Sequence, residues 1–86
     1  MHAITNTRND LEGTGKPLTD LQSQVLSFIG RFHVAKGYPP TRGEISKEFG
    51  WTHPSAAQKH INLIEKKGYI KVMPKISRGI VVVKYD

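Results

Sequence analysis

"EISKEFGWTHPSAAQKHI", residues 44 to 61, has the pattern of two helices joined by a tight turn. The first half carries charged side chains and stops at Gly50, and glycine commonly stands just past the end of a helix. The second half opens with His53 and Pro54, and proline suits the first position of a helix because no backbone donor is needed there. This stretch therefore predicts a helix-turn-helix.

The second of these helices is predicted over residues 54–67 and has two chemically different sides. With each residue turning the helix by about 100°, the apolar residues Ala57, Ile61 and Ile64 fall on one side. The other side carries hydroxyl, amide and basic groups, from Ser55, Gln58, Lys59, Asn62 and Lys66. The polar side is therefore expected to face away from the core.

The first of the two helices is predicted to begin at Thr41 and to be about nine residues long. Thr41 and Glu44 have the spacing of a capping box, and Pro40 is placed to pack on Ile45 as a hydrophobic staple. A helix this short is not stable alone, so packing against the rest of the chain must hold it.

A longer helix is predicted upstream, with Thr19 at its start and Lys36 and Gly37 at its end. Thr19 and Gln22 form a second capping-box pattern. Apolar residues recur at three- and four-residue steps, at Leu18, Leu21, Val25, Leu26, Phe28, Ile29 and Phe32. This wide apolar face is typical of a helix that covers a core.

The C-terminal part reads as a β-hairpin, with strands at "YIKVM" (69–73) and "IVVVKY" (80–85) and a loop at 74–79. Two strands alone are marginally stable, so they must pack on the helices. The order of elements predicts an α+β fold, mainly α, over residues 18–86. It is a winged helix-turn-helix, with three helices and a two-stranded β-hairpin as the wing. Residues 1–17 are polar and are expected to form a flexible tail.

Composition narrows the class of function. The chain has 86 residues, enough for one domain, and no cysteine, which excludes a disulfide framework and a thiolate zinc site. Neither a signal peptide nor a membrane-spanning run is apparent, so a cytoplasmic location is expected, at the nucleoid if the protein binds DNA. Residues 36–86 hold ten basic and four acidic side chains, a net charge of +6. A basic half on a small domain favours a polyanionic partner.

Double-stranded DNA fits this pattern. An α-helix fits the major groove, where each base pair shows a distinct set of donors and acceptors, and amides, hydroxyls and basic groups can read them. Helix 54–67 is therefore the predicted recognition helix, and wing 74–79 is expected on the DNA backbone or in the minor groove. From these elements the candidate DNA-binding residues are Gln58, Lys59, Asn62, Lys66, Lys75 and Arg78, joined by Thr41 and Arg42 from the preceding helix.

Several segments also resemble a known family. "LTDLQSQVLSFI", "GYPPTRGEISKEFGW", "HPSAAQKHINLIEKKGYI" and "SRGI", within residues 18 to about 83, resemble the N-terminal DNA-binding domain of LexA-type SOS repressors. The resemblance implies a winged helix-turn-helix with its recognition helix at 54–67. It also implies base or backbone contacts near His53, Ser55, Ala56, Gln58 and Lys59.

Two departures from the family pattern limit what can be transferred. Family members carry Ser-Pro-Asn-Ala-Ala-Glu where this chain has "HPSAAQ" followed by Lys59, so the surface is more basic and the family's operator does not carry over. Family repressors also continue into a self-cleaving peptidase domain, with a serine–lysine dyad, that supports dimerisation. That domain is expected to be missing here, where the sequence stops at Asp86.

The sequence thus predicts a DNA-binding protein that recognises specific sequences, a repressor or regulator of prokaryotic, phage or plasmid type that binds as a homodimer on DNA. No serine has histidine and carboxylate partners at a catalytic spacing, and His53 and His60 lie about 10 Å apart along a helix, too far to share a metal easily. No enzyme activity, cofactor, metal or small-molecule substrate is therefore expected. Trp51 is expected to pack in the turn and His60 at the edge of the core.

Two alternatives stay open. The chain could be a winged-helix protein–protein interaction module that acts as an accessory factor to another regulator. Such a surface would show exposed aromatic residues, for which only Tyr69 and Tyr85 are candidates. The chain could also be the DNA-binding piece of a regulator whose switch lies on a separate chain.

Overall fold

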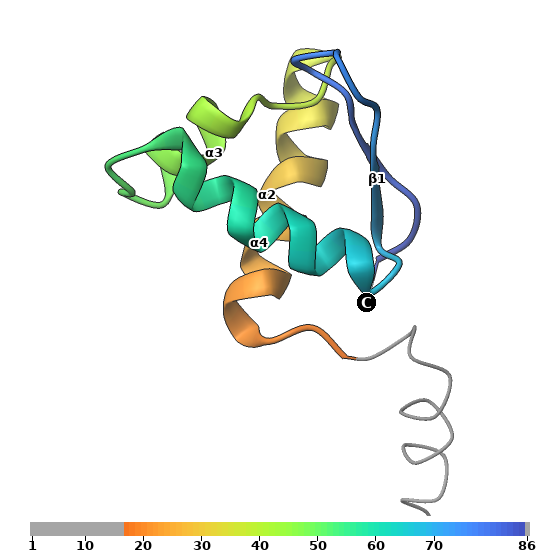
Figure 1. The fold of residues 1–86 in the computed structure, drawn as a ribbon. Coiled ribbons are helices and arrows are strands. Elements are labelled where there is room, and N and C mark those ends of the chain that lie inside the picture. Colours follow the sequence, from red (N-terminus) through yellow and green to blue (C-terminus); the bar gives the residue numbers. More distant parts are fainter. Residues whose placement is uncertain (1–16, 86) are drawn as a thin grey trace, which may run out of the picture.

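The computed structural model describes residues 17–85, which form three helices followed by a hairpin (Figure 1). The elements are α2 (Asp20–Lys36), α3 (Arg42–Glu48), α4 (Pro54–Lys66), β1 (Ile70–Val72) and β2 (Ile80–Val82). The two strands are antiparallel, with Ile70 opposite Val82 and Val72 opposite Ile80. The predicted winged helix-turn-helix is confirmed. The predicted tail falls almost entirely on residues 1–16, outside the described residues.

Both predicted capping boxes are present. The Thr19 hydroxyl accepts from the Gln22 backbone N–H at 3.2 Å, and the Gln22 side chain accepts from the Thr19 N–H at 3.1 Å. Thr41 and Glu44 make the same exchange at 3.1 and 2.8 Å. Each box satisfies backbone donors that have no partner inside the helix, and so it fixes where the helix begins.

Two glycines end the helices of the helix-turn-helix. Gly50 and Gly68 have φ of 74° and 90°, in the left-handed region that glycine enters without strain. The next residue then folds back: the Trp51 N–H donates to the Ser46 carbonyl at 2.8 Å, and the Tyr69 N–H donates to that of Ile64 at 3.3 Å. Helix α3 has seven residues rather than the predicted nine, because Thr41 and Phe49 are its cap residues.

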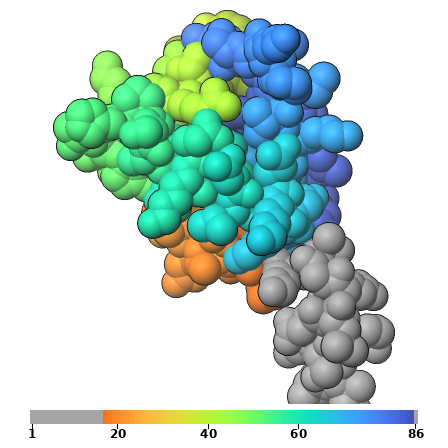
Figure 2. Space-filling model, viewed as in Figure 1, coloured from red at the N-terminus to blue at the C-terminus, as the bar shows by residue number. Residues whose placement is uncertain are grey.

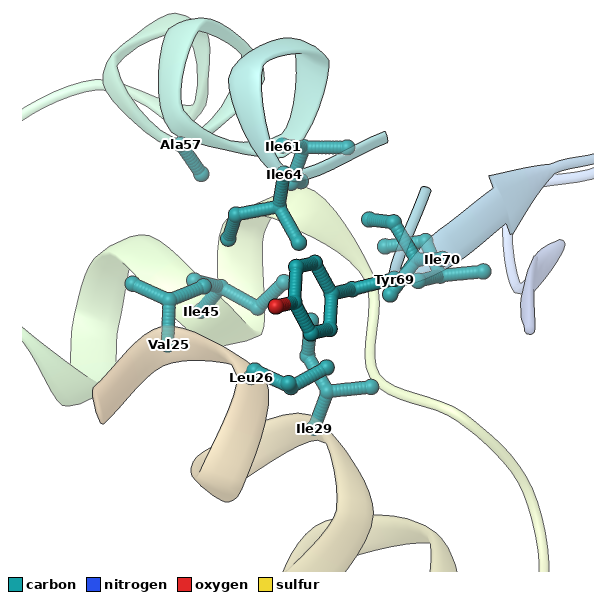
Figure 3. Close-up of a cluster of buried hydrophobic side chains, with 10 residues drawn as sticks. Val25, Leu26, Ile29, Ile45, Ala57, Ile61, Ile64, Tyr69 and Ile70 are labelled. Atoms are coloured by element: carbon teal, nitrogen blue, oxygen red, sulfur yellow. The ribbon is translucent and has the colours of Figure 1, made fainter. Parts of the chain in front are cut away.

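The core lies where α2, α3, α4 and the hairpin meet. Figure 3 shows the Tyr69 ring surrounded by aliphatic side chains from the three helices. The buried apolar residues are Val25, Leu26, Ile29, Ile45, Ala57, Ile61, Ile64, Tyr69, Ile70 and Ile80. Leu21, predicted on the apolar face of α2, is instead 37% exposed. The buried neighbour at that end of α2 is Gln22, whose amide has polar partners.

Polar contacts tie the ends of the elements together. The Lys67 ammonium group, just after α4, donates to the Gln22 side-chain oxygen at 2.6 Å and to the Pro17 carbonyl at 3.0 Å. The Glu65 carboxylate accepts from the Val72 N–H at 2.9 Å and so holds β1 against α4. The regular strands are shorter than the predicted runs 69–73 and 80–85.

Candidate DNA-binding surface

Helix α4 presents its polar side to solvent, as its sequence predicts. Its apolar residues Ala57, Ile61 and Ile64 are fully buried. On the opposite side, Ser55, Lys59, Asn62 and Lys66 are exposed, and Gln58 is half-buried. Figure 2 shows α4 across the middle of the visible face, with the turn that precedes it on one side and the hairpin on the other. The polar side chains are therefore carried on a rigid, core-backed element.

The start of α4 is open to an anion. The His53 side chain makes no capping hydrogen bond, and Pro54 occupies the first turn, which contains no acidic residue. The His53 carbonyl accepts from the buried Ser46 hydroxyl at 2.9 Å, which fixes the turn on α3. A helix N-terminus carries a partial positive charge and unpaired N–H groups. Exposed His53 and Ser55, with half-buried Ala56, surround this end.

A hydrogen-bonded chain joins α3 to the polar side of α4. The Arg42 Nε–H donates to the Gln58 Oε1 atom. The Gln58 Nε2 group in turn donates to the Asn62 Oδ1 atom at 2.6 Å. Three of the predicted DNA-binding residues are therefore brought together, but they are also partners of one another. The sequence gives no sign of the Arg42–Gln58 contact, because the two residues are sixteen positions apart on different helices.

Aromatic side chains fill the turn between α3 and α4. The Trp51 ring stacks on Phe49 and on His60, with ring centres 5.1 and 4.7 Å apart. Trp51 and His60 are both half-buried. The predictions that Trp51 packs in the turn and that His60 lies at the edge of the core are confirmed. This stack holds the angle between the two helices.

The wing joins β1 to β2 and carries Lys75 at its tip. Lys75 is exposed and has a φ of 66°, a left-handed conformation that is uncommon outside glycine. Pro74 precedes it, and proline followed by a residue with positive φ is the arrangement that type II turns require. The Lys75 side chain therefore extends from a tight turn.

Arg78, the other predicted wing contact, has its partners within the fold. Its guanidinium group pairs with the Glu44 carboxylate at 2.7 and 3.0 Å, and it donates to the Pro39 carbonyl at 2.9 Å. It also lies 4.4 Å from the centre of the Tyr38 ring. In Figure 1 the wing accordingly lies beside the segment between α2 and α3. The sequence predicts Arg78 on the DNA backbone or in the minor groove. In the structure its contacts make it a link between the wing and α3.

The ion pair changes the acidity of Glu44. The hydrogen bond from Arg78 and the backbone N–H of Thr41 both favour the ionised carboxylate, and they lower the Glu44 pKa from 4.5 to about 2. The carboxylate raises the pKa of Arg78 in return. Glu44 therefore stays ionised throughout the physiological range, and its charge is compensated within the fold.

The remaining cations divide into two groups. Lys67 is half-buried and holds Gln22, so it is less available to an outside partner. The other lysines in the second half of the chain are exposed, namely Lys47, Lys59, Lys66, Lys71, Lys75 and Lys84, and the Lys84 ammonium lies over the Tyr69 ring. The exposed lysines on and around α4 and the wing supply the positive charge that an anionic partner would meet.

Residues 17–85 give no sign of a metal site or of a membrane segment. Within this range no three histidine, cysteine, aspartate or glutamate residues are grouped so that they could hold a metal ion. Among the helices described, none is long and apolar enough to cross a membrane.

Comparison with protein families decides the assignment. The model of the LexA DNA binding domain matches residues 15–79, which include all three helices, β1 and the loop 74–79. The chain belongs to the LexA DNA-binding domain family. Its fold is therefore that of a LexA-type DNA-binding domain, and DNA is the partner that this family assignment implies.

This LexA-type domain spans about a third of the length of two curated relatives that it matches. A LexA repressor from Pseudomonas chlororaphis is 46% identical over 63 residues, which are 73% of this chain. A LexA repressor from Actinobacillus succinogenes is 42% identical over 65 residues, or 76% of this chain. In both cases the match spans only 31% of the relative's length.

Proposed function

We propose that this LexA-type domain binds double-stranded DNA at specific sequences and represses or regulates transcription in a prokaryote, phage or plasmid. One observation carries the proposal: the outward side of α4 combines hydroxyl, amide and ammonium groups with no carboxylate. Glu65 is the one acidic residue in the α4 sequence, and its side chain is bound to the Val72 N–H. The names of the relatives support the repressor role.

The proposed docking places α4, the recognition helix (54–67), in the major groove. Gln58 and Lys59 lie in the second turn of α4, within reach of base edges, and Asn62 follows one turn later. Lys66 lies at the far end of α4 and is assigned to a phosphate. His53, Ser55 and Ala56 surround the helix start, where backbone N–H groups suit a phosphate or a base edge.

The wing (74–79) and the start of α3 complete the proposed interface. Lys75 at the wing tip is placed to meet the DNA backbone or the minor groove. Arg78 positions the wing through Glu44, and any phosphate contact would have to compete with that pair. Thr41 and Arg42 begin α3, close to the recognition helix, and Arg42 reaches it through Gln58.

High affinity is expected to need two copies. A single DNA-binding module buries only about 600–1,000 Å² of protein surface, which gives weak specific binding. Two copies on a repeated or palindromic site, with half-sites about one helical turn apart, would bind the same face of the DNA as a homodimer.

We assign no catalytic step, cofactor or small-molecule substrate to the domain. It acts by occupying DNA, and its proposed location is therefore the cytoplasm, at the nucleoid.

Selection of bound sequences from random duplex DNA tests this function. The 86-residue chain should enrich one motif, and the motif should contain two related half-sites. A synthetic duplex with one half-site should then bind much more weakly than the full site. Recovery of no enriched motif would contradict specific DNA binding, and equal affinity for one half-site and two would contradict the two-copy arrangement.

A protein–protein interaction role remains the second candidate, and one observation favours it. Apolar side chains are exposed on the hairpin and just after it: Met73, Ile76, Val81, Val83 and Tyr85 are 43 to 62% exposed. Tyr69, the other aromatic candidate, is buried at 6% exposure and does not contribute. The exposed apolar residues lie outside the polar side of α4. A DNA selection that fails while the chain is folded would favour this role.

A further inference from the structure

We propose that Arg42 sets the base preference of this domain by orienting Gln58 and Asn62 so that both offer hydrogen-bond donors to the major groove, which favours guanine. The inference rests on the proposed DNA binding and goes beyond it. A glutamine side chain that is free to turn pairs with adenine through a donor and an acceptor together. The contacts of Gln58 in the structure lead to a different preference.

The first step is the contact between Arg42 and Gln58. A guanidinium group has five N–H donors and no acceptor. The Gln58 atom that meets Arg42 must therefore be the amide oxygen, as the Nε to Oε1 hydrogen bond has it. Arg42 thus fixes which end of the Gln58 amide is directed toward α3.

The orientation of the Gln58 amide in turn fixes the orientation of the Asn62 amide. With its oxygen held by Arg42, the Gln58 amide approaches Asn62 with its nitrogen, 2.6 Å from the Asn62 Oδ1 atom. A donor needs an acceptor opposite it, so Asn62 must also place its oxygen toward Gln58. The two residues are one helical turn apart, at the spacing where glutamine and asparagine side chains meet on a helix.

The third step counts what is left for DNA. The side-chain oxygens of Gln58 and Asn62 are both engaged. One Gln58 amide hydrogen and both Asn62 amide hydrogens remain, and Lys59 beside them carries only donors. Each amide oxygen keeps one lone pair, but the oxygen itself is turned toward its protein partner. This part of the polar side therefore offers donors and little accepting capacity.

A protein surface that mainly donates hydrogen bonds pairs with some bases better than with others. In the major groove guanine shows two acceptors, N7 and O6, whereas adenine shows one acceptor and one donor. Cytosine shows a donor, which would face another donor. The surface formed by Gln58, Lys59 and Asn62 should therefore favour guanine over adenine by ~5-fold or more, and it should disfavour cytosine most.

The experiment compares the sites selected by the unmodified chain, Arg42→Met, Gln58→Ala and Lys66→Met. The position read by Gln58 is the one at which Gln58→Ala loses its preference, and the unmodified chain should select guanine there. Arg42→Met keeps a long side chain but removes the donor, which frees the Gln58 amide to turn. Its guanine-to-adenine ratio should fall from ~5 or more toward 1.

Lys66→Met is the matched control, because it removes a charge from the same surface without touching Gln58. It should weaken binding to all sequences and leave the base ratio unchanged. Thermal unfolding of each variant shows whether it is folded, and Arg42→Leu provides a second variant if Arg42→Met is not folded. Leucine also lacks a hydrogen-bond donor, so the guanine-to-adenine ratio should fall there too.

The outcomes separate this inference from the proposed function. Enrichment of adenine or cytosine at the Gln58 position by the unmodified chain would overturn the inference while DNA binding stands. So would a base ratio that folded Arg42→Met or Arg42→Leu leaves unchanged, since Arg42 would then not orient Gln58. Failure of the folded, unmodified chain to enrich any sequence would instead overturn the proposed function itself.

Discussion

Arg78 and Glu44 form a two-pronged ion pair that links the wing to the first turn of α3, with nitrogen–oxygen distances of 2.7 and 3.0 Å. The same carboxylate accepts from the Thr41 N–H at 2.8 Å. Glu44 therefore serves the capping box and the wing at once. A change at this residue should affect both the start of α3 and the position of the hairpin.

Stability should depend on pH through Glu44. Its pKa is lowered from 4.5 to about 2 in the fold, so the unfolded chain binds the proton more readily. The contribution of the ion pair is fully present above pH ~4.5 and is lost as pH falls toward 2. Glu44→Gln should lower the melting temperature by a few degrees at pH 7, and the difference from the unmodified chain should shrink below pH 4.

Glu48→Gln is the control for this series, because Glu48 lies on the same helix, is exposed and has no ion pair with a described residue. Its melting temperature should differ little from that of the unmodified chain at every pH. A Glu44→Gln difference that stays constant from pH 7 to pH 2 would show that the ion pair does not hold the wing.

The core predicts a sharp contrast between two neighbours on α4. Ile64 is fully buried among residues of the three helices and the hairpin, whereas Leu63 is 39% exposed. Ile64→Ala should lower the free energy of unfolding by ~2–5 kcal/mol, because it removes apolar contacts and leaves a cavity. Leu63→Ala should cost under ~1 kcal/mol. Urea unfolding measures the free energy of unfolding of both variants. If both lost the same amount, Ile64 would not lie on the core face of α4.

Local features of the fold could be predicted because their signals lie within a few residues. Thr41 and Glu44 show the start of α3 by their spacing, and Gly50 shows its end, since both act through nearby backbone groups. Placing the residues of α4 at about 100° per residue likewise separates its buried and exposed sides correctly. Such patterns depend on helix geometry alone.

Long-range pairings could not be predicted. Arg78 meets Glu44 across 34 positions, and Lys67 meets Gln22 across 45. Composition counts Arg78 and Lys67 as positive charges but does not show whether they have partners. The packing of the hairpin and of α2 determines that both are paired within the fold. Leu21 was likewise misplaced, because the α2 pattern is wide and the core covers only part of it.

Affinity for DNA should fall with salt, with a slope set by the unpaired lysines. Lys67 and Arg78 have partners in the fold, which leaves about four to five lysines for phosphates. The slope of log affinity against log salt should therefore be about −4. Lys66→Ala should reduce its magnitude by ~1, since one phosphate contact is lost. Filter binding or fluorescence anisotropy at several salt concentrations measures it.

Arg31→Met is the comparison for Lys66→Ala. Arg31 lies on α2 with its guanidinium 5.9 Å from the Phe28 ring, outside the proposed interface. Its removal should leave the slope unchanged. Affinity that stays flat between low and moderate salt would contradict phosphate contact altogether.

Base reading by α4 is tested most directly by the affinity of Gln58→Ala for the selected duplex and for a scrambled duplex. Gln58 lies in the second turn of α4, between Arg42 and Asn62. Its replacement should cost ~1–3 kcal/mol on the selected duplex and little on the scrambled one, so the ratio of the two affinities should fall. Equal loss on both duplexes, or no loss on either, would show that this surface of α4 does not read bases.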